Sequence, residues 1–158
     1  MTQAREHRLS LLDVATIVVT LVLAVLAAWI ALRGPTGQVP VHFGIDGRPD
    51  RWGSRFEIVG VIALLAAMSG AVGGGMGLFA RRAADPSRAR SLRIGQFVVV
   101  ASMGLCGLLI ANQVLAAVSG TAMQLKATPL IMSLILILTG AVLGRVSPNP
   151  FVGVRTPW

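Results

Sequence analysis

Four long apolar runs, separated by shorter polar segments, dominate the hydropathy pattern of the chain. The runs cover residues 14–32, 58–80, 94–119 and 127–144. A bilayer core about 30 Å thick needs roughly 20 apolar residues at a rise of about 1.5 Å each, so three runs are long enough to cross it and the fourth is near the lower limit. The pattern therefore predicts an all-α integral membrane protein, folded as a four-transmembrane-helix bundle.

The polar segments between the runs define the expected organisation, a single membrane domain over 1–158. The expected elements are transmembrane helices at about 11–32, 57–80, 94–119 and 128–145, an extracytoplasmic loop at 33–56, a cytoplasmic loop at 81–93 and a cytoplasmic carboxy-terminal motif at 146–158. A mean hydropathy of +0.76 agrees with this assignment, because so apolar a chain would be insoluble as a water-exposed domain.

The net charge of +8 is explained by its distribution along the chain. With four crossings, nine basic residues fall on one side of the membrane and five on the other. The first group comprises Arg5, Arg8, Arg81, Arg82, Arg88, Arg90, Arg93, Arg145 and Arg155, and the second comprises Arg33, Arg48, Arg51, Arg55 and Lys126. The positive-inside rule then places both termini in the cytoplasm. The expected partner of these arginines is the anionic bilayer surface rather than a nucleic acid.

Arginine supplies nearly all of the basic residues, a bias typical of GC-rich bacterial coding. We therefore expect a multi-pass protein of a bacterial cytoplasmic membrane.

Small residues mark one face of the second expected helix. Gly70, Gly73, Gly74 and Gly77 are spaced so that a neighbouring backbone could approach closely. We favour packing within the chain over a dimer face, with Gly104 and Gly107 on the third helix as the partner surface. On the opposite side of the second helix, Val61 and Ala66 are expected to face lipid.

The four runs carry no ionisable side chain deep in the membrane, and Asp13 lies within a turn of the inner end of the first helix. Pumps and coupled transporters usually need such groups for their proton or ion pathway. This class of function is therefore disfavoured.

The loop between the first two helices concentrates unusual chemistry in the stretch PVHFGIDGRPDRWGS. His42, Asp46 and Asp50 could be read as metal ligands, but three mixed ligands without a cysteine or second histidine make a weak zinc pattern. We favour an ordered interfacial turn, with Asp–Arg pairs and with aromatic side chains on the headgroup layer. The chain has no recognisable catalytic triad, nucleotide loop or paired carboxylates, so we expect neither an enzyme nor a cofactor or metal site.

The carboxy-terminal stretch SPNPFVGVRTPW is also more patterned than a frayed tail. Its prolines prevent a continuing helix, and Phe151 and Trp158 are suited to the membrane interface.

These two segments resemble those of bacterial SdpI-type membrane proteins, which confer immunity to a secreted toxin peptide. The outer stretch is similar to the P-x-H-F, G, P-D and W pattern of a small domain of unknown function that precedes the SdpI region. Residues 148–158, PNPFVGVRTPW, are similar to the P-N-x-F-x-G-I-R-T-P-W element of that family. Because family members commonly continue through further helices, the chain is expected to be a shortened member.

The resemblance implies a non-enzymatic protein that protects the membrane against an antimicrobial peptide and, in some members, retains a cytoplasmic repressor at the membrane. The implied outer binding surface comprises His42, Phe43, Asp46, Pro49, Asp50 and Trp52. The implied cytoplasmic surface comprises Asn149, Gly153, Arg155, Thr156, Pro157 and Trp158.

Two alternative functions stay open at this point. Glycine-lined helices would suit an accessory subunit of a larger membrane complex, whose function is lateral packing. A small-solute or lipid transporter is weaker, because it should enclose a polar cavity rather than a glycine-packed interior.

Overall fold

A computed structural model describes residues 9–43, 49–119 and 127–143, and these residues are mostly helical. The elements in chain order are α1 (Leu11–Arg33), β1 (Val39–Phe43), β2 (Pro49–Gly53), α2 (Arg55–Met68), the π-helical segment η1 (Ser69–Gly73), α3 (Gly74–Arg82), α4 (Pro86–Ser119) and α5 (Ala127–Leu143).

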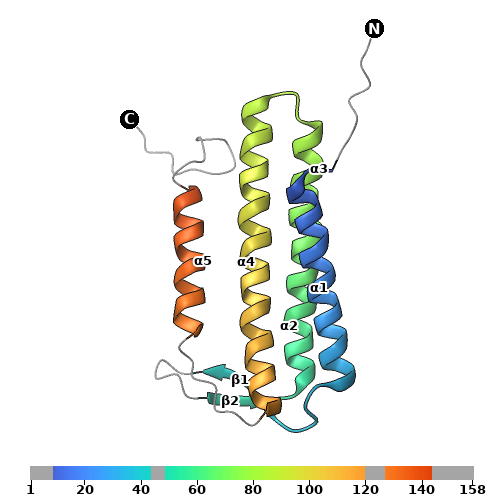
Figure 1. The fold of residues 1–158 in the computed structure, drawn as a ribbon, viewed down its shortest axis with the longest axis vertical. Coiled ribbons are helices and arrows are strands. Elements are labelled where there is room, and N and C mark those ends of the chain that lie inside the picture. Colours follow the sequence, from blue (N-terminus) through green and yellow to red (C-terminus); the bar gives the residue numbers. More distant parts are fainter. Residues whose placement is uncertain (1–8, 44–48, 120–126, 144–158) are drawn as a thin grey trace.

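The helices run side by side, with α4 at the centre of the arrangement (Figure 1). On one side of α4 lie α1 and the rod formed by α2, η1 and α3, and on the other side lies α5. The β1–β2 hairpin lies at one end of the bundle, beside the start of α2, and the turn between α3 and α4 lies at the opposite end. We call these the hairpin end and the basic end, the latter carrying Arg81, Arg82, Arg88, Arg90 and Arg93.

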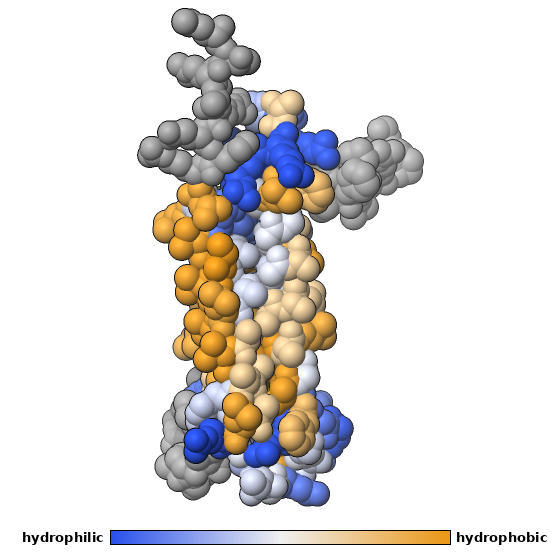
Figure 2. Space-filling model, turned by 90° about the vertical axis from the view of Figure 1, so that its right-hand side faces the viewer, coloured by the Kyte–Doolittle hydropathy of each residue, from blue (hydrophilic) through white to orange (hydrophobic). Residues whose placement is uncertain are grey.

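Three helices in the described part of the chain are long and apolar enough to cross a membrane: Leu11–Arg33, Arg55–Arg82 and Pro86–Val114. Helix α5 has 17 residues and is about 25 Å long, somewhat shorter than a bilayer core of about 30 Å. Figure 2 shows the apolar belt that these helices form between two hydrophilic ends. The chain is thus a multi-pass membrane protein.

The connection between the second and third spans is much shorter than the expected loop at 81–93. Helix α3 continues to Arg82, and α4 begins at Pro86 rather than at 94. The Asp85 carboxylate caps α4 by accepting hydrogen bonds from the Ser87 hydroxyl (2.7 Å) and the Ser87 backbone N–H (2.9 Å). These hydrogen bonds lower the pKa of Asp85. The apolar run alone missed this start, because the first two turns of α4 are polar and project beyond the apolar belt.

The expected outer loop at 33–56 contains an antiparallel hairpin rather than an isolated turn. Val39 pairs with Gly53, His42 with Arg51 and Phe43 with Pro49, with irregular register between these pairs. The first strand, Val39–Phe43, carries β-branched and aromatic residues of the kind enriched in strands. Pro49–Gly53 pairs with it as the second strand.

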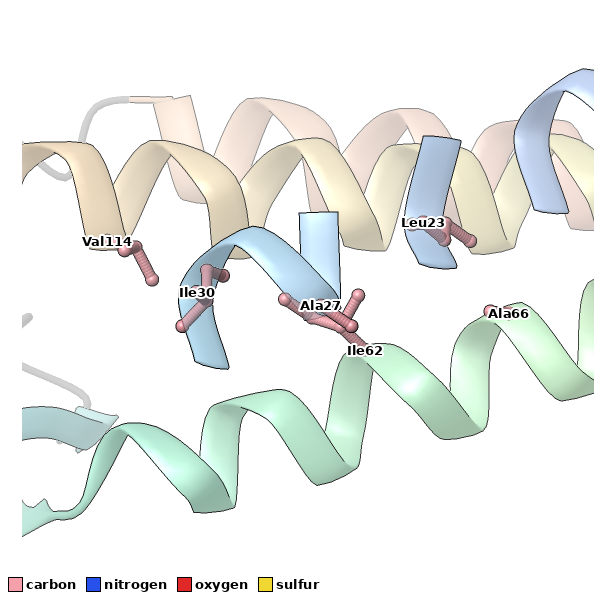
Figure 3. Close-up of a cluster of buried hydrophobic side chains, with 6 residues drawn as sticks. All are labelled: Leu23, Ala27, Ile30, Ile62, Ala66 and Val114. Atoms are coloured by element: carbon pink, nitrogen blue, oxygen red, sulfur yellow. The ribbon is translucent and has the colours of Figure 1, made fainter. Parts of the chain in front are cut away.

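An apolar cluster holds the hairpin half of the bundle together (Figure 3). Its buried members come from α1, α2 and α4: Leu23, Ala27, Ile30, Ile62, Ala66 and Val114. The prediction that Ala66 faces lipid is wrong, because its side chain is only 7% exposed, whereas Val61 is 50% exposed. Four residues from Ile62, Ala66 falls on the same face of α2 and meets α1 there.

The glycines of η1 and α3 lie against the neighbouring helices at three of the four predicted positions. A Cβ atom at Gly70 would lie 3.3 Å from the Thr20 methyl group on α1, and one at Gly73 would lie 2.9 Å from Val100 on α4. A Cβ atom at Gly77 would overlap the carboxylate of Asp13 on α1. The two predicted partner glycines of α4 meet α1 rather than this face, since Gly104 lies against Val19 and Gly107 against Leu23.

The prediction that Gly74 lies in a close helix contact is wrong, because a Cβ atom there would have no neighbour within 4 Å. The sequence spacing assumed a regular α-helix, in which residues four apart share a face. In the structure Gly74 follows the π-helical segment at Ser69–Gly73, and no neighbouring helix comes close enough to contact it. The close helix contact therefore uses Gly73 and Gly77, and Gly74 borders open space.

We predict that Gly77→Ala destabilises the protein, whereas Gly74→Ala does not. The added methyl group at position 77 would collide with the Asp13 carboxylate, and overpacking of this kind costs about 1–3 kcal/mol. Thermal unfolding of the detergent-solubilised variants measures the difference, with a lower midpoint for Gly77→Ala. Equal midpoints for the two variants would contradict the close contact at Gly77.

Candidate functional site

The hairpin is fixed to the ends of two membrane-spanning helices. Val39 is 2% exposed and anchors β1 to the bundle. Next to it, the guanidinium Nη1 of Arg55, at the start of α2, donates a hydrogen bond of 2.9 Å to the backbone carbonyl of Gly34, at the end of α1. These contacts give the hairpin a fixed position at the membrane surface.

Two polar pairs close the hairpin and connect it to α2. Nδ1 of His42 lies 2.6 Å from Oδ1 of Asp50, across the two strands. Nη2 of Arg51 donates to Oε2 of Glu57 at 3.0 Å. The Glu57 carboxylate also accepts a hydrogen bond of 3.3 Å from the backbone N–H of Ser54, which stabilises the first turn of α2. All four paired side chains are solvent-exposed, so each pair orders the surface more than it adds stability.

Exposed aromatic side chains lie beside these pairs. Trp52 is 54% exposed and Phe56 is 61% exposed. The guanidinium of Arg55 lies 5.1 Å from the centre of the Phe56 ring, within the range of a cation–π contact. The hairpin end thus offers large apolar groups among charged groups, a combination suited to the headgroup layer or to an amphipathic peptide.

Four of the six predicted outer residues are described on the hairpin: His42, Pro49, Asp50 and Trp52. For Phe43 the structure describes only its backbone in β1, and Asp46 lies outside the described residues. Among the described residues of this segment, Asp50 pairs with His42 and Arg51 pairs with Glu57, rather than Asp with Arg. Among the described residues, no group of His, Cys, Asp or Glu side chains is arranged to hold a metal ion.

The predicted cytoplasmic surface lies outside the described residues. It comprises Asn149, Gly153, Arg155, Thr156, Pro157 and Trp158. Its role stays a prediction from the sequence.

A buried polar cluster near the basic end was not predicted. Asp13 on α1 is 6% exposed and receives two hydrogen bonds from the Arg93 guanidinium on α4, at 2.6 and 3.2 Å. Gln96, which is fully buried, donates to the Asp13 carboxylate at 3.2 Å and to the Thr16 hydroxyl at 3.0 Å, and it accepts from Arg93 at 2.8 Å. The cluster joins α1 to α4 across the bare surface at Gly77.

The sequence contained a signal for this cluster. Arg93 and Gln96 are three residues apart and share a face of α4, one turn before the uninterrupted apolar stretch. The expected helix start at 94 left Arg93 in a loop. On α1, Asp13 also forms a capping box with Ser10.

A half-open pocket of about 230 Å³ lies beside the buried cluster, between α1 and the η1–α3 rod. The residues that line it are Leu9, Asp13, Thr16, Ile17, Thr20, Leu21, Gly70, Gly74, Arg81 and Gln96. The open space at Gly74 is part of this pocket.

Comparison with known proteins matches residues 16–66 to a family described as a domain of unknown function, DUF1648. The matched segment contains most of α1, the hairpin and most of α2. Neither a curated protein nor a solved structure matches the chain. The match therefore includes the hairpin and leaves out Asp13, Arg93 and the carboxy-terminal motif.

We predict that Asp13 and Arg93 stabilise the fold as a pair. Asp13→Asn and Arg93→Gln should each lower the unfolding midpoint, because each leaves a largely buried partner uncompensated. The double variant should be less destabilised than the sum of the two, with a coupling energy of about 1–3 kcal/mol.

The measurement is thermal unfolding in detergent of wild type, both single variants and the double variant. Arg90→Gln is the control, since Arg90 is exposed on the same helix. Additive effects of the two substitutions would show that the pair contributes nothing beyond its separate residues.

Proposed function

We propose that the protein is a non-enzymatic immunity protein of the SdpI type, which binds an antimicrobial toxin peptide at the outer face of a bacterial cytoplasmic membrane. The observation that carries the proposal is the hairpin end. The stretch whose sequence resembles that of SdpI-type proteins forms a hairpin that is held by a cross-strand polar pair and carries exposed aromatic and charged side chains. A mere connection between two helices would need neither the two polar pairs nor the exposed indole of Trp52.

The proposed mode of action follows from the depth of these groups. An apolar toxin peptide approaches the bilayer through the headgroup layer, where Trp52 and Phe56 offer apolar contact area. The His42–Asp50 pair offers hydrogen-bonding groups beside them. Binding there would hold the peptide at the surface and keep it from inserting. The cytoplasmic motif at 146–158 would carry the second role, retention of a repressor once toxin is bound.

This role requires the hairpin end to be extracytoplasmic. We propose four crossings, with α5 as the fourth, and both termini in the cytoplasm. The arginine excess at the basic end supports this orientation, since Arg81, Arg82, Arg88 and Arg90 lie within a few residues of the α3–α4 turn.

Cysteine labelling tests the orientation. A membrane-impermeant thiol reagent applied to intact cells should modify a Gly37→Cys variant and spare a Ser87→Cys variant, because the two exposed positions lie at opposite ends of the bundle. Permeabilised cells should show both labelled, which controls for reactivity. Labelling of Ser87→Cys alone in intact cells would reverse the orientation.

Substitutions in the hairpin test the function. Asp50→Ala and Trp52→Ala should abolish protection of cells exposed to the cognate toxin, at unchanged abundance in the membrane, because they remove binding groups from an exposed surface. Gln38→Ala, an exposed change just before β1, is the matched control and should keep protection. Loss of the hairpin variants from the membrane would instead identify Asp50 and Trp52 as structural residues.

Protection is measured as the survival of cells that express each variant and are exposed to secreted antimicrobial peptides.

Arg155→Ala should impair the cytoplasmic output while leaving binding at the outer face intact. Co-purification of a stable partner complex, without protection against any peptide, would favour the accessory-subunit alternative.

The transporter alternative has less support in the described part of the bundle. The apolar cluster of Figure 3 fills the hairpin half of the bundle. Glycine contacts and the Asp13–Arg93 pair fill the other half. The pocket lies to the side of these contacts, between α1 and the η1–α3 rod.

A further inference from the structure

Arg81 is an unusual arginine among the described residues at the basic end. Its Nε atom is buried and has no hydrogen-bond partner there. Arg93, by contrast, is paired with Asp13. A buried guanidinium N–H without an acceptor is costly, so this group calls for an acceptor from outside the described part of the chain.

The polar groups that share the pocket with Arg81 are already engaged. The Thr16 hydroxyl donates to the Leu12 carbonyl at 2.7 Å, and the Thr20 hydroxyl donates to Ser69 at 3.1 Å. The negative charge of Asp13 is compensated by Arg93 at 2.6 Å. The Nε–H of Arg81 is thus an unsatisfied donor in this pocket, and the positive charge of its guanidinium favours an anionic acceptor.

The rest of the pocket wall is apolar or bare. Leu9, just before α1, forms one side together with Ile17 and Leu21 of α1, and Gly70 and Gly74 form the floor along η1 and α3. The two α1 residues in the span, Ile17 and Leu21, are about half exposed, so the pocket opens on the lateral surface of the bundle.

The helices that form the pocket cross the membrane, so this lateral opening faces acyl chains, and Arg81 lies toward the headgroups. We propose that the pocket binds one anionic phospholipid, with its phosphate on Arg81 and an acyl chain in the slot along Ile17, Leu21 and Gly74. A guanidinium matches a phosphate through paired, charge-assisted hydrogen bonds. This inference does not depend on the immunity function.

The apolar walls decide between a lipid and a soluble phosphate. A free anion would leave the slot at Gly74 unfilled, whereas a lipid fills both the cationic end and the slot. Gly74 borders this space with no neighbour within 4 Å of a Cβ atom, so an acyl chain can lie against it.

Native mass spectrometry of the full chain in mild detergent tests the proposal. The protein is titrated with dioleoyl-phosphatidylglycerol or with dioleoyl-phosphatidylcholine, and the fraction that carries one lipid is measured. Wild type should retain phosphatidylglycerol in preference to phosphatidylcholine. Arg81→Gln should weaken this retention about tenfold, the loss expected for one charge-assisted hydrogen bond.

Two matched controls come from adjacent positions. Arg82→Gln removes the same charge from an exposed neighbour and should leave retention nearly unchanged. Gly74→Leu should fill the slot and lower retention, whereas Gly75→Leu, at an open position that does not line the pocket, should not. Because Gly74→Leu keeps Arg81, it tests the slot even where Arg81→Gln folds poorly.

Several outcomes would overturn the site. Equal loss in Arg81→Gln and Arg82→Gln would indicate attraction by net charge alone, and equal retention of the two lipids would remove the role of the anion. Displacement of the lipid by millimolar glycerophosphoglycerol, which has the headgroup and no acyl chains, would indicate a soluble anion site instead.

Discussion

The contact between Asp13 on α1 and Arg93 on α4 is the interaction on which the basic half of the bundle depends. In a bilayer, apolar helices gain little by burying apolar surface against one another, because lipid tails are equally apolar. Close packing and polar contacts must therefore fix the arrangement of α1, α3 and α4. Gly77 provides the necessary space, since any side chain there would displace the Asp13 carboxylate and the Gln96 amide. Once Asp13 is held, Arg93 and Gln96 are both satisfied at the end of the apolar belt, where the cost of charge is smaller than at the membrane centre.

The other half of the bundle is held together differently. There, Ile30, Ile62 and Val114 interdigitate, and the hairpin closes over their end through Val39. The hairpin depends on this packing for its position, because its own polar pairs are exposed and each contributes little energy. What these pairs provide is order: they hold Trp52 and its neighbours in a defined arrangement at the depth where a peptide would meet the membrane.

Hydropathy was sufficient to predict the helical character and the membrane location, because long apolar runs have few alternatives in a bilayer. It was insufficient wherever a helix leaves the apolar belt. The polar first turns of α4 were read as a loop, which separated Arg93 from the helix that presents it to Asp13. The hairpin was read as a turn, because its turn residues were more conspicuous than its short strands. The glycine pattern identified the right surface, but it could not indicate that the space beside Gly74 stays open. Of the candidate site, the outer residues could be predicted from their residue types. The pocket at Arg81 depends on the distance between α1 and the η1–α3 rod, which no local pattern specifies.

The π-helical segment also separates the two halves of the molecule. At Ser69 it accepts a hydrogen bond from Thr20 on α1, and on the hairpin side of this contact the packing is apolar, while on the basic side it uses glycines and charges. The rod presents Ala66 to the apolar cluster, Gly77 to the polar cluster and Gly74 to the open slot. The surfaces proposed for a peptide and for a lipid thus lie at opposite ends of one rod, and each can change in sequence without disturbing the packing that supports the other.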